Sequence, residues 1–242
     1  MKTFLTLLLA LTPCLTQPHN KSLENSIGMQ LVFITAGSFT MGSPYENEMR
    51  QDDEKPHNVI IERGFYMSAT EVTQAQWTAV MGHNKSFHKG DSLPAEKMSW
   101  KEAVVFCEKL SEREGKTYRL PTEAKWEYAC RAGEESPSMD QLGDTAWYAM
   151  NSGGRTQPVA QKQPNAWGLY DLLGNISEWC ADGDVADYAA DADTIAQSRS
   201  KVIRGGAFDS FPPACRAAAR TSGPAAYKYA QTGFRVVLEI TH

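Results

Sequence analysis

Hydrophobic and polar residues alternate over the first third of the chain in short runs that predict β-strands. The segment MQLVFITAGSFTMGS, at 29–43, carries β-branched and aromatic residues on both sides of Gly37, which favours two strands joined by a turn. The segment HNVIIERGFYMSATEVT, at 57–73, continues this pattern. Because residues 18–28 are polar and rich in turn formers, we expect a short tether there, before a folded domain that begins near Met29.

Helices are predicted where capping residues precede a segment with helical spacing. Thr73 and Gln76 have the spacing of a capping box before QAQWTAVM, and Gly82 is a typical helix stop. Ser99 and Glu102 repeat this spacing further along the chain. Two helices are therefore expected after the first strands.

The second of these helices should run from Trp100 to Glu112. A third, shorter helix should begin near Thr122 and end at Gly133. The apolar face of the second helix is predicted to contain Ala103, Phe106, Cys107 and Leu110.

Gly, Pro, Asn, Asp and Ser dominate the chain after Glu134, which predicts long loops. The segment 185–201 is acidic and rich in alanine, and its charges favour a solvated surface helix or loop. Such loops need bulky buried side chains to hold them, and an indole ring buries a large area while its N–H finds a partner. Four tryptophans are predicted for this role: Trp126, Trp147, Trp167 and Trp179. The whole pattern predicts one α+β domain over residues 29–242.

Composition and charge narrow the possible partners. The 242 residues are 42% apolar, which is enough for a packed core. The net charge is −5, and no basic cluster is present. We therefore expect no nucleic-acid partner.

The first residues predict export. Residues 1–17 combine Lys2 with an apolar run from Phe4 to Leu11, which is typical of an export signal and too short to span a bilayer comfortably. Cys14 lies where a lipoprotein carries its acylated cysteine, so lipidation of Cys14 and simple cleavage are the two alternatives. We expect an exported protein at the cell surface or outer membrane, attached to the membrane through an N-terminal lipid anchor.

Four further cysteines lie in the exported part of the chain. Their even number permits two disulfides in an oxidising compartment, and buried free thiols are the alternative. Their wide spacing and the scattered histidines argue against a zinc site. The four are Cys107, Cys130, Cys180 and Cys215.

Seven ordered motifs between residues 29 and 238 resemble the family of formylglycine-generating enzymes and sulfatase-modifying factors. They are GSFTMGS, EVTQAQW, MSWKEAVVFCEKLS, YRLPTEAKWEYACRAG, PNAWGLYDLLGNISEWCAD, VIRGG and TGFRVV. The resemblance implies a C-type lectin fold of the formylglycine-generating-enzyme type, an α+β architecture with small antiparallel sheets, few helices and long loops. The residues alone predict only an α+β domain.

The enzyme branch of this family uses two cysteines, shortly after the RGG motif, to bind copper, and soft thiolates suit Cu(I). Only Cys215 occurs in that window, and Ser210 stands where the resemblance implies the first cysteine. A hydroxyl does not replace a thiolate, so we expect no enzyme activity and no required cofactor. A formylglycine-generating oxidase or another enzyme of this family is the alternative. The resemblance also makes Cys130 with Cys215 the preferred disulfide.

The motif GNISEW resembles a stretch that holds a structural calcium ion in members of the family. The side-chain oxygens of Asn175 and Glu178, with backbone carbonyls, would suit this hard cation. The alternative is that Asn175 forms a turn and Glu178 forms a buried ion pair or a cap.

The segment 204–235 encloses a restricted set of residue types between fixed anchors. The anchors are Arg204, Gly205, Gly206, Cys215, Arg216, Gly233, Phe234 and Arg235. The sixteen interior residues of interest all have types encoded by codons that end in C or T, as asparagine codons become when their adenines are replaced. They are Ala207, Phe208, Asp209, Ser210, Phe211, Pro212, Pro213, Ala214, Thr221, Ser222, Gly223, Ala225, Ala226, Tyr227, Tyr229 and Ala230. Lys228 and Gln231 do not fit that codon set, so we expect them to be fixed scaffold positions.

This pattern resembles the variable proteins of diversity-generating retroelements, and the treponemal type most of all. The resemblance implies a surface-displayed protein whose hypervariable residues bind a ligand without catalysis. We expect a monomer that binds a protein or glycan of another cell or host. Exposed positions tolerate substitution at little cost in stability, and aromatic side chains among small ones resemble an antibody paratope. The alternatives are a loop whose aromatic residues pack inward and an accessory envelope protein without a specific ligand.

Overall fold

The structure of the chain is a computed structural model that describes residues 21–133, 141–184 and 198–240. The predicted export signal at 1–17, which includes Cys14, lies outside the described residues, as does most of the predicted surface segment at 185–201. Among the helices that the structure describes, none is long and apolar enough to cross a membrane.

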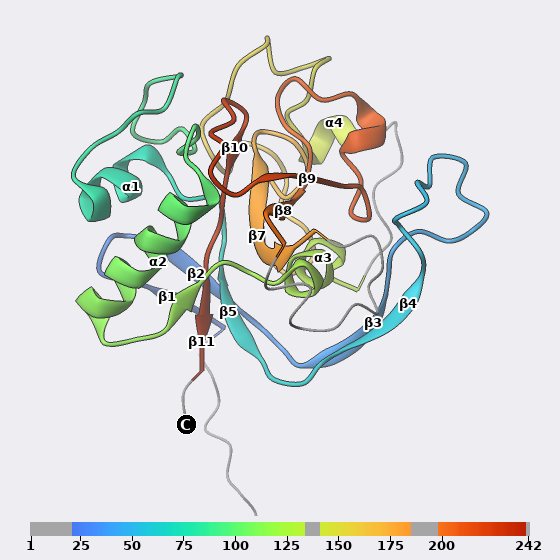
Figure 1. Ribbon diagram of the computed structural model, residues 1–242, viewed down its shortest axis with the longest axis horizontal. Helices are drawn as coiled ribbons and strands as arrows, with labels where there is room; N and C mark the ends of the chain where they lie inside the picture. The colour runs from blue at the N-terminus through green and yellow to red at the C-terminus, as the bar shows by residue number, and fades with distance from the viewer. Residues whose placement is uncertain (1–20, 134–140, 185–197, 241–242) are drawn as a thin grey trace, which may run out of the picture.

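The largest sheet has five strands, all antiparallel to their neighbours. β1 (Ser22–Glu24) is one edge and pairs with β2 (Gln30–Ile34). Next come β5 (Phe65–Ser68) and β11 (Val237–Glu239), and β6 (Tyr118–Arg119) is the other edge. Figure 1 shows how the last strand of the chain runs beside β5, so both ends of the described chain contribute to one sheet.

The folded domain begins before Met29, which corrects the predicted tether at 18–28. β1 lies within that segment, and Leu23 of β1 is opposite Leu31 of β2. Leu23 and Ile27 also pack against the core. Burial of these isolated apolar side chains favours the ordered segment although its composition is typical of a linker.

A second sheet carries the candidate ligand-binding segment. β8 (Ser200–Arg204) lies between β7 (Ser177–Gly183) and β9 (Arg220–Pro224), and it is antiparallel to both. β10 (Thr232–Gly233) pairs with the other side of β7 in parallel. The expectation of antiparallel sheets therefore fails for this one pair.

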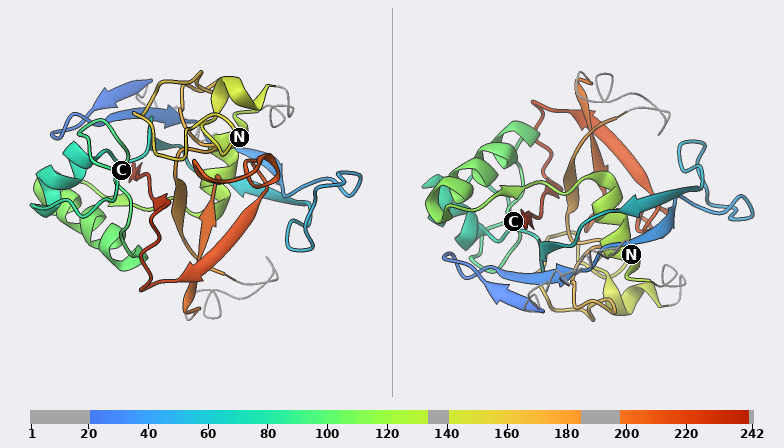
Figure 2. Two further views of the ribbon diagram at one scale, coloured as in Figure 1. Left: turned by 90° about the horizontal axis from the view of Figure 1, so that it is seen from above. Right: turned by 90° about the horizontal axis from the view of Figure 1, so that it is seen from below.

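A hairpin of β3 (Gly37–Met41) and β4 (His57–Ile61) forms a third, two-stranded sheet. Helices α1 (Gln74–Met81) and α2 (Trp100–Glu114) begin at the predicted capping boxes and end at glycines with positive φ. Both views in Figure 2 place these helices at one end of the molecule and the hairpin at the other.

The remaining helices are short. α3 (Glu123–Arg131) begins at the predicted cap Thr122, but its C-cap is Ala132 rather than Gly133. α4 (Leu142–Thr145) was not predicted, because its residues lie in a segment rich in loop formers and have no side-chain N-cap. The fold is α+β with small mixed sheets, as the family resemblance implies.

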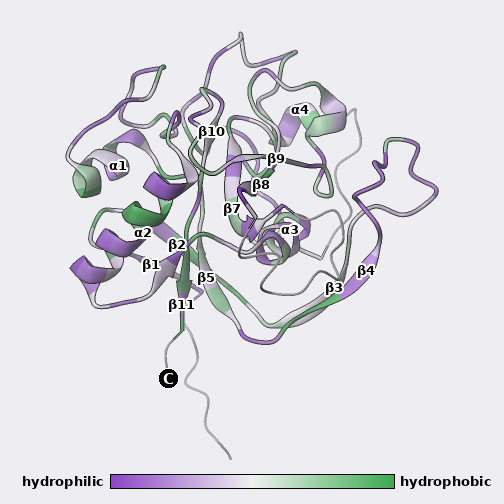
Figure 3. Cartoon of the chain, viewed as in Figure 1, coloured by the Kyte–Doolittle hydropathy of each residue, from purple (hydrophilic) through white to green (hydrophobic). Residues whose placement is uncertain are grey.

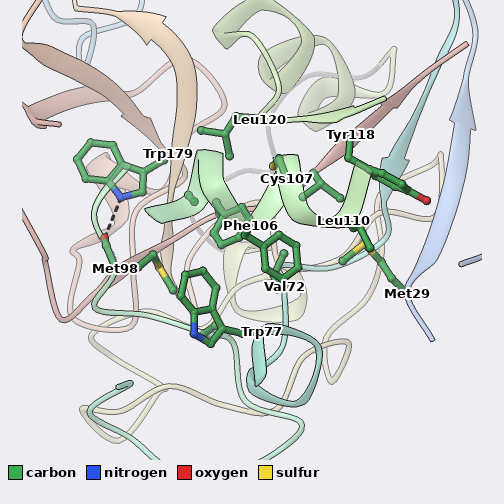
Figure 4. Close-up of a cluster of buried hydrophobic side chains, with 14 of the residues drawn as sticks. Met29, Val72, Trp77, Met98, Phe106, Cys107, Leu110, Tyr118, Leu120 and Trp179 are labelled. Atoms are coloured by element: carbon green, nitrogen blue, oxygen red, sulfur yellow. Dashed lines mark hydrogen bonds between the residues drawn. The ribbon is translucent and has the colours of Figure 1, made fainter. Parts of the chain in front are cut away.

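The first of two buried clusters packs α1 and α2 against the two larger sheets (Figure 4). Trp77 stacks on Phe106, with ring centroids 5.6 Å apart. The indole N–H of Trp179 donates to the carbonyl of Met98. The four residues predicted for the apolar face of α2 are all buried, and Figure 3 shows hydrophobic and hydrophilic stretches along this helix.

The tryptophans differ in how deeply they are buried. Trp126 and Trp179 are fully buried, as predicted for anchors. Trp147 and Trp167 are only partly buried. Lys162 lies over the Trp147 ring with its ammonium 4.0 Å from the centroid, so this ring borders the surface.

Candidate ligand-binding face

Arg235 fastens the end of the chain to the middle of the domain through a buried ion pair. Its guanidinium donates to both carboxylate oxygens of Glu178 at 2.7–2.9 Å. Glu178 also accepts a hydrogen bond of 2.7 Å from the indole N–H of Trp126. All three side chains are inaccessible to solvent. Since the loss of one partner would leave a buried charge without compensation, these residues fix the frame behind residues 204–235, which contain the predicted variable positions and are called the variable segment below.

Arg204 and Arg216 anchor the variable segment itself. Arg204 pairs with Glu127 of α3, and both side chains are fully buried. Arg216 donates to both carboxylate oxygens of Glu54 at 2.7 and 2.9 Å. Burial raises the pKa of Glu54, but the hydrogen bonds from Arg216 and Ser43 outweigh it and leave this pKa below its usual value. Each arginine thus ties the segment to a distant part of the chain.

A cavity of about 450 Å³ lies over these anchors. Residues between 205 and 214 form one wall, and Arg220–Ser222 of β9 form another. Tyr229 and Gln231 also line it, together with Gln51 from the loop between β3 and β4. The cavity is therefore bordered mainly by residues of the variable segment.

Most of the sixteen predicted variable residues reach solvent. Eight are exposed: Asp209, Phe211, Pro213, Ala214, Thr221, Ala226, Tyr227 and Ala230. Five are partly buried: Ser210, Pro212, Ser222, Ala225 and Tyr229. Three are buried: Ala207, Phe208 and Gly223. We call the first thirteen the variable face.

Phe208 does not lie on the surface, contrary to the expectation that the aromatic residues of this segment are displayed. It is only 8% exposed, and its ring packs edge-on against His88 with centroids 5.3 Å apart. Its N–H donates to the carbonyl of Asn175, and its own carbonyl accepts from the Ser152 hydroxyl. These contacts make Phe208 part of the support of the face.

The other three aromatic residues reach solvent to different degrees. Phe211 and Tyr227 are 71% and 60% exposed. Tyr229 packs between Tyr227 and Trp179, with centroid distances of 5.0 and 6.0 Å. Its ring also covers Gly223, where an added Cβ would lie 2.5 Å from the tyrosine hydroxyl. A side chain at position 223 would therefore require the Tyr229 ring to shift.

The loop that contains Phe87 and His88 was not predicted from the sequence to belong to this site. Phe87 is 67% exposed, and the backbone N–H groups of both residues donate to the carboxylate of Glu96. The contact between His88 and Phe208 joins this loop to the variable segment. An aromatic residue in a polar stretch was the only local signal, because the partners are far apart in sequence.

The predicted calcium ligands are occupied by protein groups. Asn175 has a left-handed backbone, with φ of 55°, and its side-chain oxygen accepts from the Gln157 N–H at 2.9 Å. Both carboxylate oxygens of Glu178 are bonded to Arg235. This arrangement does not fit a calcium ion and matches the alternative of a turn and a buried ion pair. Over residues 21–133, 141–184 and 198–240, no three His, Cys, Asp or Glu side chains gather in a way that could hold a metal.

The four described cysteines are free thiols, which corrects the preferred disulfide between Cys130 and Cys215. Burial raises the pKa of Cys215 to about 12, so this thiol stays protonated near neutral pH. Ser210, which stands where the resemblance implies the first cysteine, accepts a hydrogen bond from the Ala207 N–H at 2.9 Å. The described part of this face therefore offers no pair of thiolates for Cu(I).

Comparison with known proteins agrees with the motifs and the fold. Residues 16–240 of the chain match the protein family described as the sulfatase-modifying factor enzyme 1-like domain. The structure is similar to Treponema denticola variable protein 1, with a TM-score of 0.81 and 26% identity over 91% of this chain and 99% of that one. It is also similar to PvdO from Pseudomonas aeruginosa, with a TM-score of 0.83 and 26% identity over 93% of this chain and 100% of that one. In sequence, it is 30% identical to the formylglycine-generating enzyme of Streptomyces coelicolor over 84% of this chain and 87% of that enzyme. The chain thus belongs to the family of sulfatase-modifying factor enzyme 1-like domains.

Proposed function

We propose that this chain is a ligand-binding protein without catalytic activity, and that the cavity and the variable face around it form its binding site. The observation that carries the proposal is that residues 204–235 combine buried anchor residues with exposed residues between them. Buried ion pairs of Arg204, Arg216 and Arg235 hold the backbone. Thirteen of the sixteen codon-compatible residues are exposed or partly exposed between them.

This arrangement should allow the exposed side chains to be substituted with little loss of stability. An exposed side chain that makes few contacts can be replaced at a cost of about 0.5 kcal/mol or less. Phe211 and Tyr227 supply a large exposed aromatic area on the variable face, and the small residues beside them in sequence leave room for a ligand. The similarity to a protein whose name describes it as variable supports this assignment.

We also propose how the residues of this face are diversified and where the protein is located. We infer that a retroelement diversifies the codons of the variable face and that the protein is exported and held at the cell surface, with Cys14 as a candidate lipid anchor. Its ligand would be a protein or glycan of another cell. A near-copy of the 3′ end of the gene, with adenines at the variable codons and a reverse transcriptase gene beside it, is the genomic observation that this requires.

Two matched libraries test the tolerance of the face. In one, codons ending in C or T randomise the thirteen positions of the variable face; in the other, they randomise Arg204, Arg216 and Arg235. We expect most members of the first library to fold and most members of the second to be unfolded. The resistance of each variant, displayed on a cell surface, to a protease that cleaves unfolded chains measures this. Selection of the first library against unrelated purified proteins should yield binders that differ only on the variable face. Equal loss of folding in both libraries, or an absence of binders, would contradict the proposal.

An oxidase of the formylglycine-generating type is the second candidate, because an enzyme with that activity is 30% identical to the chain. The single protonated thiol of Cys215 argues against it. Copper(I) titration and oxygen consumption with a cysteine-containing sulfatase peptide test this directly. We expect no copper-dependent oxygen uptake, and a signal that Cys215→Ser abolishes would establish the enzyme instead.

A further inference from the structure

β9 is the outer strand of its sheet, and the direction of its backbone groups follows from the register. Ala225 continues the β8–β9 pairing, and its N–H donates to the carbonyl of Arg199 at 3.0 Å. Hydrogen-bonded and non-hydrogen-bonded pairs alternate in antiparallel strands, so Thr221 and Gly223 also bond to β8. Ser222, between them, directs its N–H and carbonyl away from β8.

The pairing of β8 with β7 gives the same orientation of the backbone groups of Ser222. The carbonyl of Ser200 accepts from the Asp184 N–H at 2.9 Å, on the side of β8 where β7 lies. Ser222 is opposite Val202, two residues further along β8, and Val202 therefore also faces β7. Outside the strand pairs, none of the backbone hydrogen bonds among the described residues involves Ser222. Because the pairing also turns Ser222 away from β8, its amide and carbonyl have no backbone partner within residues 21–133, 141–184 and 198–240, and Ser222 lines the cavity.

We propose that β9 receives an extended polypeptide segment of the ligand as an added strand, with Ser222 as the paired residue. This inference rests on the proposed function and names its partner as a protein with an accessible extended segment. An extended peptide carries one N–H and one carbonyl at the spacing that a strand edge presents, whereas the hydroxyl groups of a glycan have no such period.

Backbone pairing suits a face whose side chains change. A substitution at position 222 alters the side chain but leaves the N–H and carbonyl in place, unless the new residue is proline. The pairing therefore supplies a contribution to affinity that does not depend on sequence, while side chains such as Thr221 and Asp209 supply specificity. Pro224 lacks an N–H and ends the pairing edge, which limits the added strand to a short register.

Ser222 offers a matched pair of variants for the test. Ser222→Pro removes the outward N–H without removing a β8–β9 hydrogen bond, and edge strands tolerate proline. Ser222→Ala removes the hydroxyl and keeps the N–H. The probe is a phage-displayed library of short linear peptides, selected on the full chain and screened for loss of binding in Phe211→Ala. Urea unfolding of both Ser222 variants confirms that the fold persists.

We expect the selected peptides to bind Ser222→Pro about tenfold more weakly than Ser222→Ala, since one hydrogen bond to an exposed edge is lost. N-methylation of the peptide should weaken binding at alternate positions only. Hydrogen exchange of the Ser222 amide in the unaltered chain should slow when peptide binds, which does not depend on any variant.

The outcomes separate this inference from the proposed function. Peptides that depend on Phe211 but bind both Ser222 variants equally, without slower exchange at Ser222, would overturn strand addition and leave ligand binding by the variable face intact. If glycans on an array bind the face and no peptide is selected, strand addition is likewise overturned and ligand binding by the variable face is kept. If no probe of either kind depends on Phe211, both the inference and the proposed function fail.

Discussion

Phe208 and Phe211 belong to the same codon-compatible segment, yet the structure assigns them opposite roles. Phe208 is 8% exposed and Phe211 is 71% exposed. Replacement of a fully buried phenylalanine by alanine costs about 3–5 kcal/mol. Scaled by the buried fraction of each residue, the free energy of unfolding should fall by about 3–5 kcal/mol in Phe208→Ala and by about 1–1.5 kcal/mol in Phe211→Ala.

Urea unfolding, monitored by tryptophan fluorescence, measures the loss of stability in both variants. If the slope of the unfolding free energy against urea concentration is unchanged, the shifts of the midpoints report changes in stability. Tyr227→Ala is a control, since this side chain is 60% exposed and should behave like Phe211. Equal losses in Phe208→Ala and Phe211→Ala would refute the division into support and display. The same division predicts that sibling copies of this gene keep an apolar residue at position 208 while position 211 varies freely.

Three further predictions concern the frame and the coupling within the face. Arg235→Met should lower the free energy of unfolding by about 3–5 kcal/mol, because it leaves the carboxylate of Glu178 buried without its partner; thermal unfolding checks this. Burial raises the pKa of Asp171 to about 6, above the value of about 3.9 expected in the unfolded chain, so its contribution to stability is full below about pH 4 and is lost as pH rises through about 6. Asp171→Asn should therefore add up to about 3 kcal/mol of stability at about pH 8 and nothing near pH 4, and urea midpoints across this range would contradict the reasoning if the gain did not depend on pH. Gly223→Ala should cost about 1–3 kcal/mol with Tyr229 present and much less in Tyr229→Ala, and a double-mutant cycle without coupling would show that the tyrosine moves aside freely.

The sequence by itself determined the features that depend on residues a few positions apart. The capping boxes at Thr73 and Ser99, and the buried face of α2, could be predicted because the partners lie within one or two helical turns. The family, the lack of a cysteine pair after RGG and the sixteen residues within 204–235 whose types are compatible with codons ending in C or T also follow from the order of residues alone.

Only the tertiary structure decided what depends on distant partners. Leu23 and Ile27 are ordered because strands and core from elsewhere in the chain cover them. Glu178 serves Arg235 rather than a calcium ion, and Phe208 is buried because the loop of His88 packs on it. The position of β9 at the edge of its sheet likewise arises from the order of the described strands. Local sequence cannot specify these outcomes, since burial and charge pairing depend on which groups the whole fold brings within a few ångströms.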